Sequence, residues 1–200
     1  MIKTKADLLE YIQEDMRMQP RPSSFVKRYL GTSGAVVRWK VCLRKCEYHH
    51  NISKNIYHRL AYFVYLFMLK RYDRRFSSEI PINVFGKGLL IWHPERIIIN
   101  PDSKVGDYCA LSSGVVIAQA HGECPTIGDH VELMIDSKVL GGIAVADNVR
   151  IGASALVLKP INEADTTWAG VPARKIPDSD CDGRGGARHR RRRRGSSHQF

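Results

Sequence analysis

His93 is the residue whose type and position could most directly do chemistry. It follows the glycine-rich segment Gly86-Lys87-Gly88 and precedes a long series of regular repeats. A neutral imidazole within hydrogen-bond reach of a hydroxyl can take the proton of that hydroxyl as it attacks, and such general bases contribute about 10²–10⁴-fold in rate. A solitary histidine at a turn is more often an exposed surface residue, so the elements around His93 must decide between the two.

A second group of polar side chains lies about thirty residues further on. His121 and Glu123 fall in the segment Ala118-Gln-Ala-His-Gly-Glu-Cys-Pro-Thr126. They could bind an acceptor molecule, and the alternative is an ordinary solvated loop tip. Cys124 lies beside them, but nothing nearby marks it as an activated thiolate.

The cysteines do not form a recognisable metal site. Cys42 and Cys46, with His49 or His50, would share one face of a helix, and no second ligand pair follows at zinc-finger spacing. We therefore expect no metal. The chain has five cysteines and a polar Met1–Glu10 segment, which predicts reduced thiols, no secretory signal and a cytoplasmic location.

The strongest pattern in the chain is a six-residue period that begins after residue 80. Ten aliphatic side chains recur six residues apart in two series: Ile99, Val105, Leu111 and Ile117, then Ile127, Leu133, Val139, Val145, Ile151 and Val157. A small or β-branched residue sits four positions after most of them. Six residues can make one short strand and one turn, so three such sides close a triangular coil whose aliphatic residues stack as a buried ladder. Antiparallel strands, the alternative, would show a period of two.

The step between the two series is ten residues instead of six. The segment Ala118–Thr126 must therefore bulge from the coils as a loop with four extra residues. Loops that project from a rigid scaffold often carry function.

Residues 1 to about 76 have helical periodicity. Thr4 and Asp7 form a capping-box pattern at the start of the first helix, and further helices are expected over about 35–48 and 53–72. The last of these is apolar nearly all round in its second half, which predicts that it lies between neighbouring elements. Its apolar run, Leu60–Leu69, is too short for a membrane span of about 20 residues. It is interpreted as buried, with a membrane-surface role as the alternative.

The net charge of +11 divides between the tail and the rest of the chain. Residues 177–200 carry seven Arg and three Asp, a balance of +4, which leaves +7 for residues 1–176. The tail composition predicts disorder. The run Arg190–Arg194 could bind nucleic acid or anionic lipid, but it has no interleaved aromatic residue, so nucleic acid is not an expected partner.

Together, the segment Phe85–His93, the six-residue repeats and the closing segment Ala169–Ile176 resemble the serine O-acetyltransferases, which belong to the hexapeptide-repeat acyltransferases. The resemblance implies an α + β fold, in which an N-terminal helical region (1–78) precedes a left-handed parallel β-helix (79–176) and a tail (177–200). It also implies an acetyl-CoA-dependent O-acetyltransferase with L-serine as acceptor, assembled as a trimer or a dimer of trimers. A sugar or polysaccharide hydroxyl is the alternative acceptor, and a non-catalytic β-helix that binds nucleic acid is a third hypothesis.

The same resemblance assigns roles to individual residues. His93 matches the active-site histidine of the family, and Glu79, fourteen residues earlier, would orient it or hold the ammonium group of the substrate. Ala153 and Ser154 are expected to line the pantetheine arm of coenzyme A. The expected partners of its phosphates are Lys159, Arg174 and Lys175.

Overall fold

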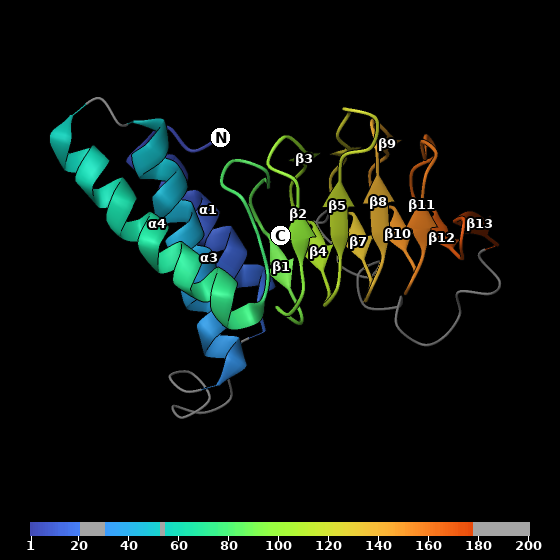
Figure 1. The fold of residues 1–200 in the computed structure, drawn as a ribbon, viewed down its shortest axis with the longest axis horizontal. Helices are drawn as coiled ribbons and strands as arrows, with labels where there is room; N and C mark the ends of the chain where they lie inside the picture. Colours follow the sequence, from blue (N-terminus) through green and yellow to red (C-terminus); the bar gives the residue numbers. More distant parts are fainter. Residues whose placement is uncertain (21–30, 53–54, 178–200) are drawn as a thin grey trace, which may run out of the picture.

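The computed structural model describes residues 1–20, 31–52 and 55–177 of the 200-residue chain. Figure 1 shows a bundle of helices at one end and a row of parallel coils that extends away from it. The coils form three parallel sheets, one on each side of a triangular prism. The predicted fold class, helices followed by a left-handed parallel β-helix, is confirmed. The prediction of a disordered tail concerns residues outside the described ranges, apart from Pro177.

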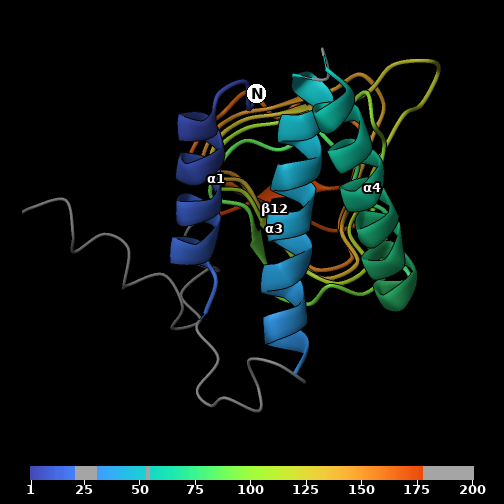
Figure 2. The same cartoon turned by 90° about the vertical axis from the view of Figure 1, so that its left-hand side faces the viewer.

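Three helices make the N-terminal end: α1 (Lys5–Met18), α3 (Thr32–Asn51) and α4 (Ile56–Phe76). The predicted capping box is present, because the Thr4 side chain accepts from the Asp7 amide and the Asp7 carboxylate accepts from the Thr4 amide. Figure 2 shows the helices side by side, with α3 between α1 and α4. The prediction that the last helix lies between neighbours is wrong for the described chain, since α4 packs on α3 with one face and exposes the other.

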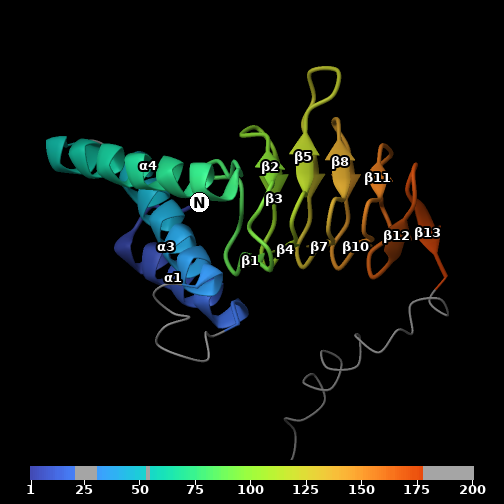
Figure 3. The same cartoon turned by 60° about the horizontal axis from the view of Figure 1, so that its bottom comes forward.

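The coils are built from strands of two or three residues. The strands are β1 (Leu90–Ile91), β2 (Ile98–Ile99), β3 (Lys104–Val105), β4 (Ala110–Leu111), β5 (Val116–Ala118), β6 (Thr126–Ile127), β7 (Glu132–Leu133), β8 (Lys138–Leu140), β9 (Ala144–Val145), β10 (Arg150–Ile151), β11 (Leu156–Val157), β12 (Thr167–Ala169) and β13 (Arg174–Ile176). The three sheets run in the orders β1-β4-β7-β10-β12-β13, β2-β5-β8-β11 and β3-β6-β9. Figure 3 shows the successive coils stacked along one axis. Among the strands of the described residues, the last pair, β12 and β13, is the antiparallel one, and it closes the far end.

The aliphatic ladder predicted from the six-residue period forms the core of the β-helix. All ten of its side chains are between 0% and 5% exposed. In-register pairing stacks them, for example Leu111 on Leu133 and Ile117 on Val139. The predicted loop is also present, because β5 ends at Ala118 and β6 starts at Thr126. The period therefore identifies both the buried side of each strand and the place where the chain leaves the coil.

Buried charged side chains from the helices satisfy the backbone at the open edge of the first coil, which has no earlier coil to pair with. Arg44 donates to the carbonyl oxygens of Phe85 and Gly86 at 3.0 and 2.5 Å. Lys40 donates to the Leu89 carbonyl at 2.7 Å, and the Asp15 carboxylate accepts from the Leu89 amide at 2.8 Å. An unpaired buried backbone group is costly, so these contacts attach the helices to the coils.

Lys40 should make folding stability depend on pH. Burial lowers the pKa of its ammonium group to about 8, against about 10.4 in an unfolded chain. Between these values the unfolded chain binds more protons, so the contribution of Lys40 to the free energy of unfolding should rise with pH from about 8 to about 10. Urea unfolding of wild type and Lys40→Met across this range measures it, with exposed Lys104→Met as the control. A difference in unfolding free energy between wild type and Lys40→Met that does not change with pH would contradict the prediction.

Candidate active site

His93 lies at the corner between β1 and β2, on backbone that is fixed from both sides. The Trp92 amide donates to the Leu111 carbonyl at 2.9 Å, and the Pro94 carbonyl accepts from the Ser78 hydroxyl at 2.5 Å. Upstream, the Gln19 side chain donates to the Ile91 carbonyl at 2.8 Å. The His93 ring itself is exposed and makes no hydrogen bond or ion pair within the described ranges. A well-held, unengaged imidazole of this kind can meet a substrate.

Glu79 lies on the same side of the prism as β2, through its pairing with Ile98. Its carboxylate is largely exposed and is 3.8 Å from the Lys70 ammonium group. No hydrogen bond or ion pair between Glu79 and His93 is present in the described part of the chain. Their expected side-chain contact is therefore not made within this single chain.

A groove of about 610 Å³ lies where α4 meets the first coil, and Glu79 is on its wall. The groove is lined by Lys70, Asp73, Arg74, Ser77, Ser78, Glu79 and Ile98. Burial raises the pKa of the Asp73 carboxyl, which accepts from the Trp39 indole at 3.1 Å. The groove therefore presents cations and a carboxylate together. Because Ser78 bonds the Pro94 carbonyl, this wall of the groove touches the residue that follows His93.

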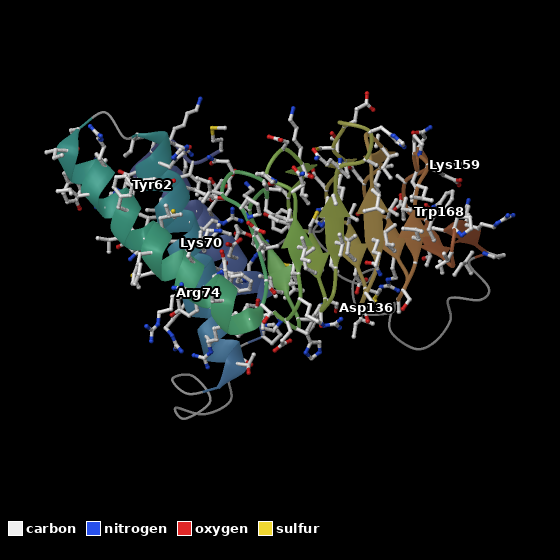
Figure 4. All side chains as sticks on the ribbon, viewed as in Figure 1. Tyr62, Lys70, Arg74, Asp136, Lys159 and Trp168 are labelled. Carbon is white, nitrogen blue, oxygen red and sulfur yellow. The ribbon has the colours of Figure 1, made fainter. Side chains whose placement is uncertain are left out.

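Of the residues that line the groove, Glu79 alone was predicted from the sequence. Lys70 and Arg74 lie at the end of a helix, where basic side chains are common for electrostatic reasons alone. Figure 4 shows both on α4, near the coils. Only the packing of the helix against the first coil brings them beside Glu79, and no local spacing predicts that.

The projecting loop carries His121 and Glu123 at another corner of the prism, between β5 and β6. The Ala120 and Glu123 backbones exchange two hydrogen bonds of 3.1 Å, which closes the loop into a tight hairpin. His121 and Glu123 are exposed. The chain enters the sheet of β2 and β5 at the corner that carries His93, and it leaves that sheet at the corner that carries His121. The two histidines are therefore on different corners, and one chain does not bring them together.

The Glu123 side chain lies against Gly142, in space that a larger residue would occupy. A Cβ atom at residue 142 would lie 2.1 Å from the Glu123 carboxylate and 2.6 Å from its Cβ. Gly142→Ala should therefore destabilise the fold by about 1–3 kcal/mol through overpacking. Denaturant unfolding of Gly142→Ala, Glu123→Gly and the double variant checks this, because removing the Glu123 side chain should recover most of the loss. If the double variant loses as much unfolding free energy as the two single variants together, residues 142 and 123 do not collide as described.

Two of the expected coenzyme A residues lie at the same corner as His93. Ala153 and Ser154 are exposed between β10 and β11. Three strand pairings separate β1 from β10 along this sheet, which corresponds to about 14 Å at the usual spacing of paired strands. The corner therefore forms a straight edge from His93 to Ser154. At this corner Arg96 of the first coil and Asp136 of the third form an ion pair of 3.1 Å that passes Gly114 of the second coil.

The three expected phosphate ligands are distributed differently. Lys159 follows β11 at the corner that carries the loop, on the opposite side from Asp136 (Figure 4). Arg174 and Lys175 lie on β13 at the far end, where Lys175 forms an ion pair with Glu163. Within one chain these cations do not gather at a single point.

The described cysteines and histidines form no group of three or more metal-binding side chains. Burial raises the pKa of the Cys42 thiol to about 11 and those of Cys46 and Cys109 to about 12. These three thiols are therefore unreactive core residues, while Cys124 in the loop is partly exposed.

No family model matches the chain. The serine acetyltransferase of Helicobacter pylori strain J99 is 30% identical over 151 residues, which cover 70% of this chain and 86% of that protein. The serine acetyltransferase of Synechococcus elongatus is 33% identical over 132 residues, covering 60% of this chain. Only 54% of the Synechococcus protein is matched, so the chain spans about half the length of this relative. A solved serine acetyltransferase in complex with CoA is similar in fold, with a TM-score of 0.63 and 20% identity over 86% of this chain and 71% of that one.

Proposed function

The chain belongs to the serine acetyltransferase family, and we propose that it transfers an acetyl group from acetyl-CoA to the hydroxyl of L-serine. The observation that carries the proposal is the position of His93, an exposed imidazole at the end of a straight solenoid edge and beside a groove of mixed charge. A thioester and an alcohol could meet at this point.

Acetyl-CoA would lie along the corner edge. A solved member of the family is a complex with CoA, and the edge from Ser154 to His93, about 14 Å, suits an extended pantetheine arm. In this arrangement the arm lies against Ala153 and Ser154, and the thioester reaches His93. Lys159, Arg174 and Lys175 remain the proposed phosphate ligands, with Lys159 supplied from a neighbouring subunit.

L-Serine would occupy the groove. Its carboxylate complements Lys70 and Arg74, and its ammonium group complements Glu79, which favours the second of the two roles expected for that residue. The serine hydroxyl then loses its proton to the His93 imidazole as its oxygen attacks the thioester carbonyl. The oxyanion is stabilised by a backbone N–H of the edge. The carbon–sulfur bond breaks, the thiolate leaves, and the imidazolium returns the proton to it.

We propose a homotrimer, or a dimer of trimers, as the working assembly. His93 and the loop with His121 and Glu123 lie at two different corners of one chain. A neighbouring prism packed against the first would bring its loop to the His93 corner, where His121 and Glu123 could bind the acceptor. In this proposal residues 79–176 are the catalytic unit and residues 1–78 the helical region. The proposed location is the cytoplasm, consistent with four free cysteines among the described residues.

A thiol-release assay tests the function. Purified chain is incubated with acetyl-CoA and either L-serine or a panel of sugars, and free coenzyme A is followed over time. Release that depends on L-serine supports the proposal. If coenzyme A release depends on a sugar and not on serine, the acceptor is that sugar. If release depends on no acceptor, acetyl transfer is refuted.

A further inference from the structure

One face of α4 is a continuous apolar surface with no partner in the described chain. We call it the α4 stripe, and its side chains are each between 41% and 68% exposed. The stripe consists of Ile56, Tyr57, Leu60, Phe63, Val64, Phe67 and Met68. Their spacing of three, four and seven residues places them on one side of the helix. The opposite side of α4, with Leu69, Asp73 and Phe76, is buried. Figure 2 shows α3 as the helix next to α4.

The stripe ends at a cluster of arginines. Arg71, Arg74 and Arg75 continue the same helical spacing and, with Met68 and Tyr72, line a hollow of about 640 Å³. None of the three guanidinium groups forms an ion pair with a carboxylate in the described ranges. The helix has one acidic residue, Asp73, and it is buried beside Trp39. The exposed face of α4 therefore combines apolar side chains with unneutralised positive charge.

We propose that α4 docks in the plane of a membrane surface that contains anionic phospholipid. Aromatic and aliphatic side chains of the stripe would enter the boundary between headgroups and acyl chains, as amphipathic helices do. The arginines would bind lipid phosphates, since guanidinium groups bind phosphate through two parallel hydrogen bonds. None of the described helices is long and apolar enough to cross a membrane. This property is additional to acetyl transfer and does not depend on it.

Charge favours a membrane over a second copy of the chain as the occupant. Two α4 faces packed together would bury the apolar stripe, but each would bring Arg59, Arg71, Arg74 and Arg75 to an interface with no exposed carboxylate on the helix. Like charges across an interface oppose association. An anionic lipid surface buries the same apolar side chains and neutralises the same cations.

Vesicle co-sedimentation tests the proposal with the full chain. The vesicles contain phosphatidylcholine alone or mixed with phosphatidylglycerol. Two double variants, Phe63→Ser/Phe67→Ser and Arg71→Gln/Arg75→Gln, remove the apolar and the cationic part of the face and leave the groove residue Arg74 in place. The matched control is Leu9→Ser/Met16→Ser, which removes exposed apolar side chains from α1. Because Arg190–Arg194 could itself bind anionic lipid, every protein is also made with that run replaced by glutamine.

Wild type should sediment with the mixed vesicles and not with pure phosphatidylcholine. Each α4 double variant should bind about tenfold more weakly or worse, while the α1 control binds as wild type does, in both tail backgrounds. A tryptophan placed by Phe67→Trp should be quenched by brominated lipid more than one placed by Leu9→Trp.

Three results would overturn the proposal. One is loss of binding on replacing the arginine run alone. Another is equal binding by the α4 variants and wild type. The third is a change in the oligomeric state of the α4 variants, measured by light scattering, without a change in lipid binding, which would assign the face to a second copy. The same variants are also assayed for coenzyme A release without vesicles. Because membrane docking does not depend on acetyl transfer, this assay reports on the catalytic proposal alone, and sedimentation reports on the membrane proposal.

Discussion

The His93→Ala enzyme should release coenzyme A in the presence of L-serine about 10²–10⁴-fold more slowly than wild type, which is the usual contribution of a general base. The ring is exposed and makes no hydrogen bond or ion pair within the described chain, so its removal should leave the fold intact. The loss should appear in kcat with little change in KM for either substrate, because the imidazole acts on the hydroxyl proton in the transition state. Initial rates at several concentrations of each substrate give this separation.

His130→Ala is the matched control for His93→Ala. His130 is also an exposed histidine at a corner of the β-helix, where it stacks on Tyr108 with the ring centroids 4.9 Å apart. It has no part in the proposed reaction, so its variant should retain wild-type rates. A His93→Ala enzyme that is as active as the His130→Ala enzyme would mean that His93 is an ordinary surface histidine.

Replacing Arg44 by methionine should cost about 3–5 kcal/mol of unfolding free energy, the largest stability effect that we expect. The guanidinium is fully buried and forms ion pairs with Asp15 at 2.9 Å and Glu47 at 3.0 Å. Its removal leaves two carboxylates buried without their cation, and it also leaves the Phe85 and Gly86 carbonyl groups without a donor. Urea unfolding followed by circular dichroism measures the loss.

An exposed ion pair provides the comparison. Arg96 and Asp136 are 3.1 Å apart, but their side chains are 62% and 38% exposed. Solvent screens such pairs, so Arg96→Met should cost no more than about 1 kcal/mol. If Arg44→Met proves no more costly than Arg96→Met, the buried network does not attach the helices to the coils as described.

The β-helix could be predicted from the sequence because its core is periodic. A residue such as Leu111 meets its equivalents from the coils on either side, so the same requirement for an aliphatic side chain recurs every six residues. The projecting loop was predictable for the same reason, as the one interruption of that period. His93 could be located because it lies between a glycine-rich segment and the first regular coil.

The contacts between helices and coils could not be predicted in this way. Lys40 and Arg44 are charged residues on a helix, a pattern that ordinarily marks a solvated face, yet both are fully buried. Their partners, Leu89 and Phe85, are more than forty residues away and contribute backbone atoms, which leave no trace in residue type. The exposed face of α4 is the reverse case, in which apolar residues were predicted to be buried and are exposed. An apolar sequence predicts burial whether or not a partner is present.

The measurement that tests the central claim most directly is the stoichiometry of product formation. Wild-type chain with acetyl-CoA and L-serine should form one O-acetylserine for each coenzyme A released, identified by mass spectrometry, and should form neither product when serine is omitted. Coenzyme A release that continues at the same rate without serine, or serine that remains unmodified while the thiol appears, would contradict acetyl transfer to the serine hydroxyl at this site.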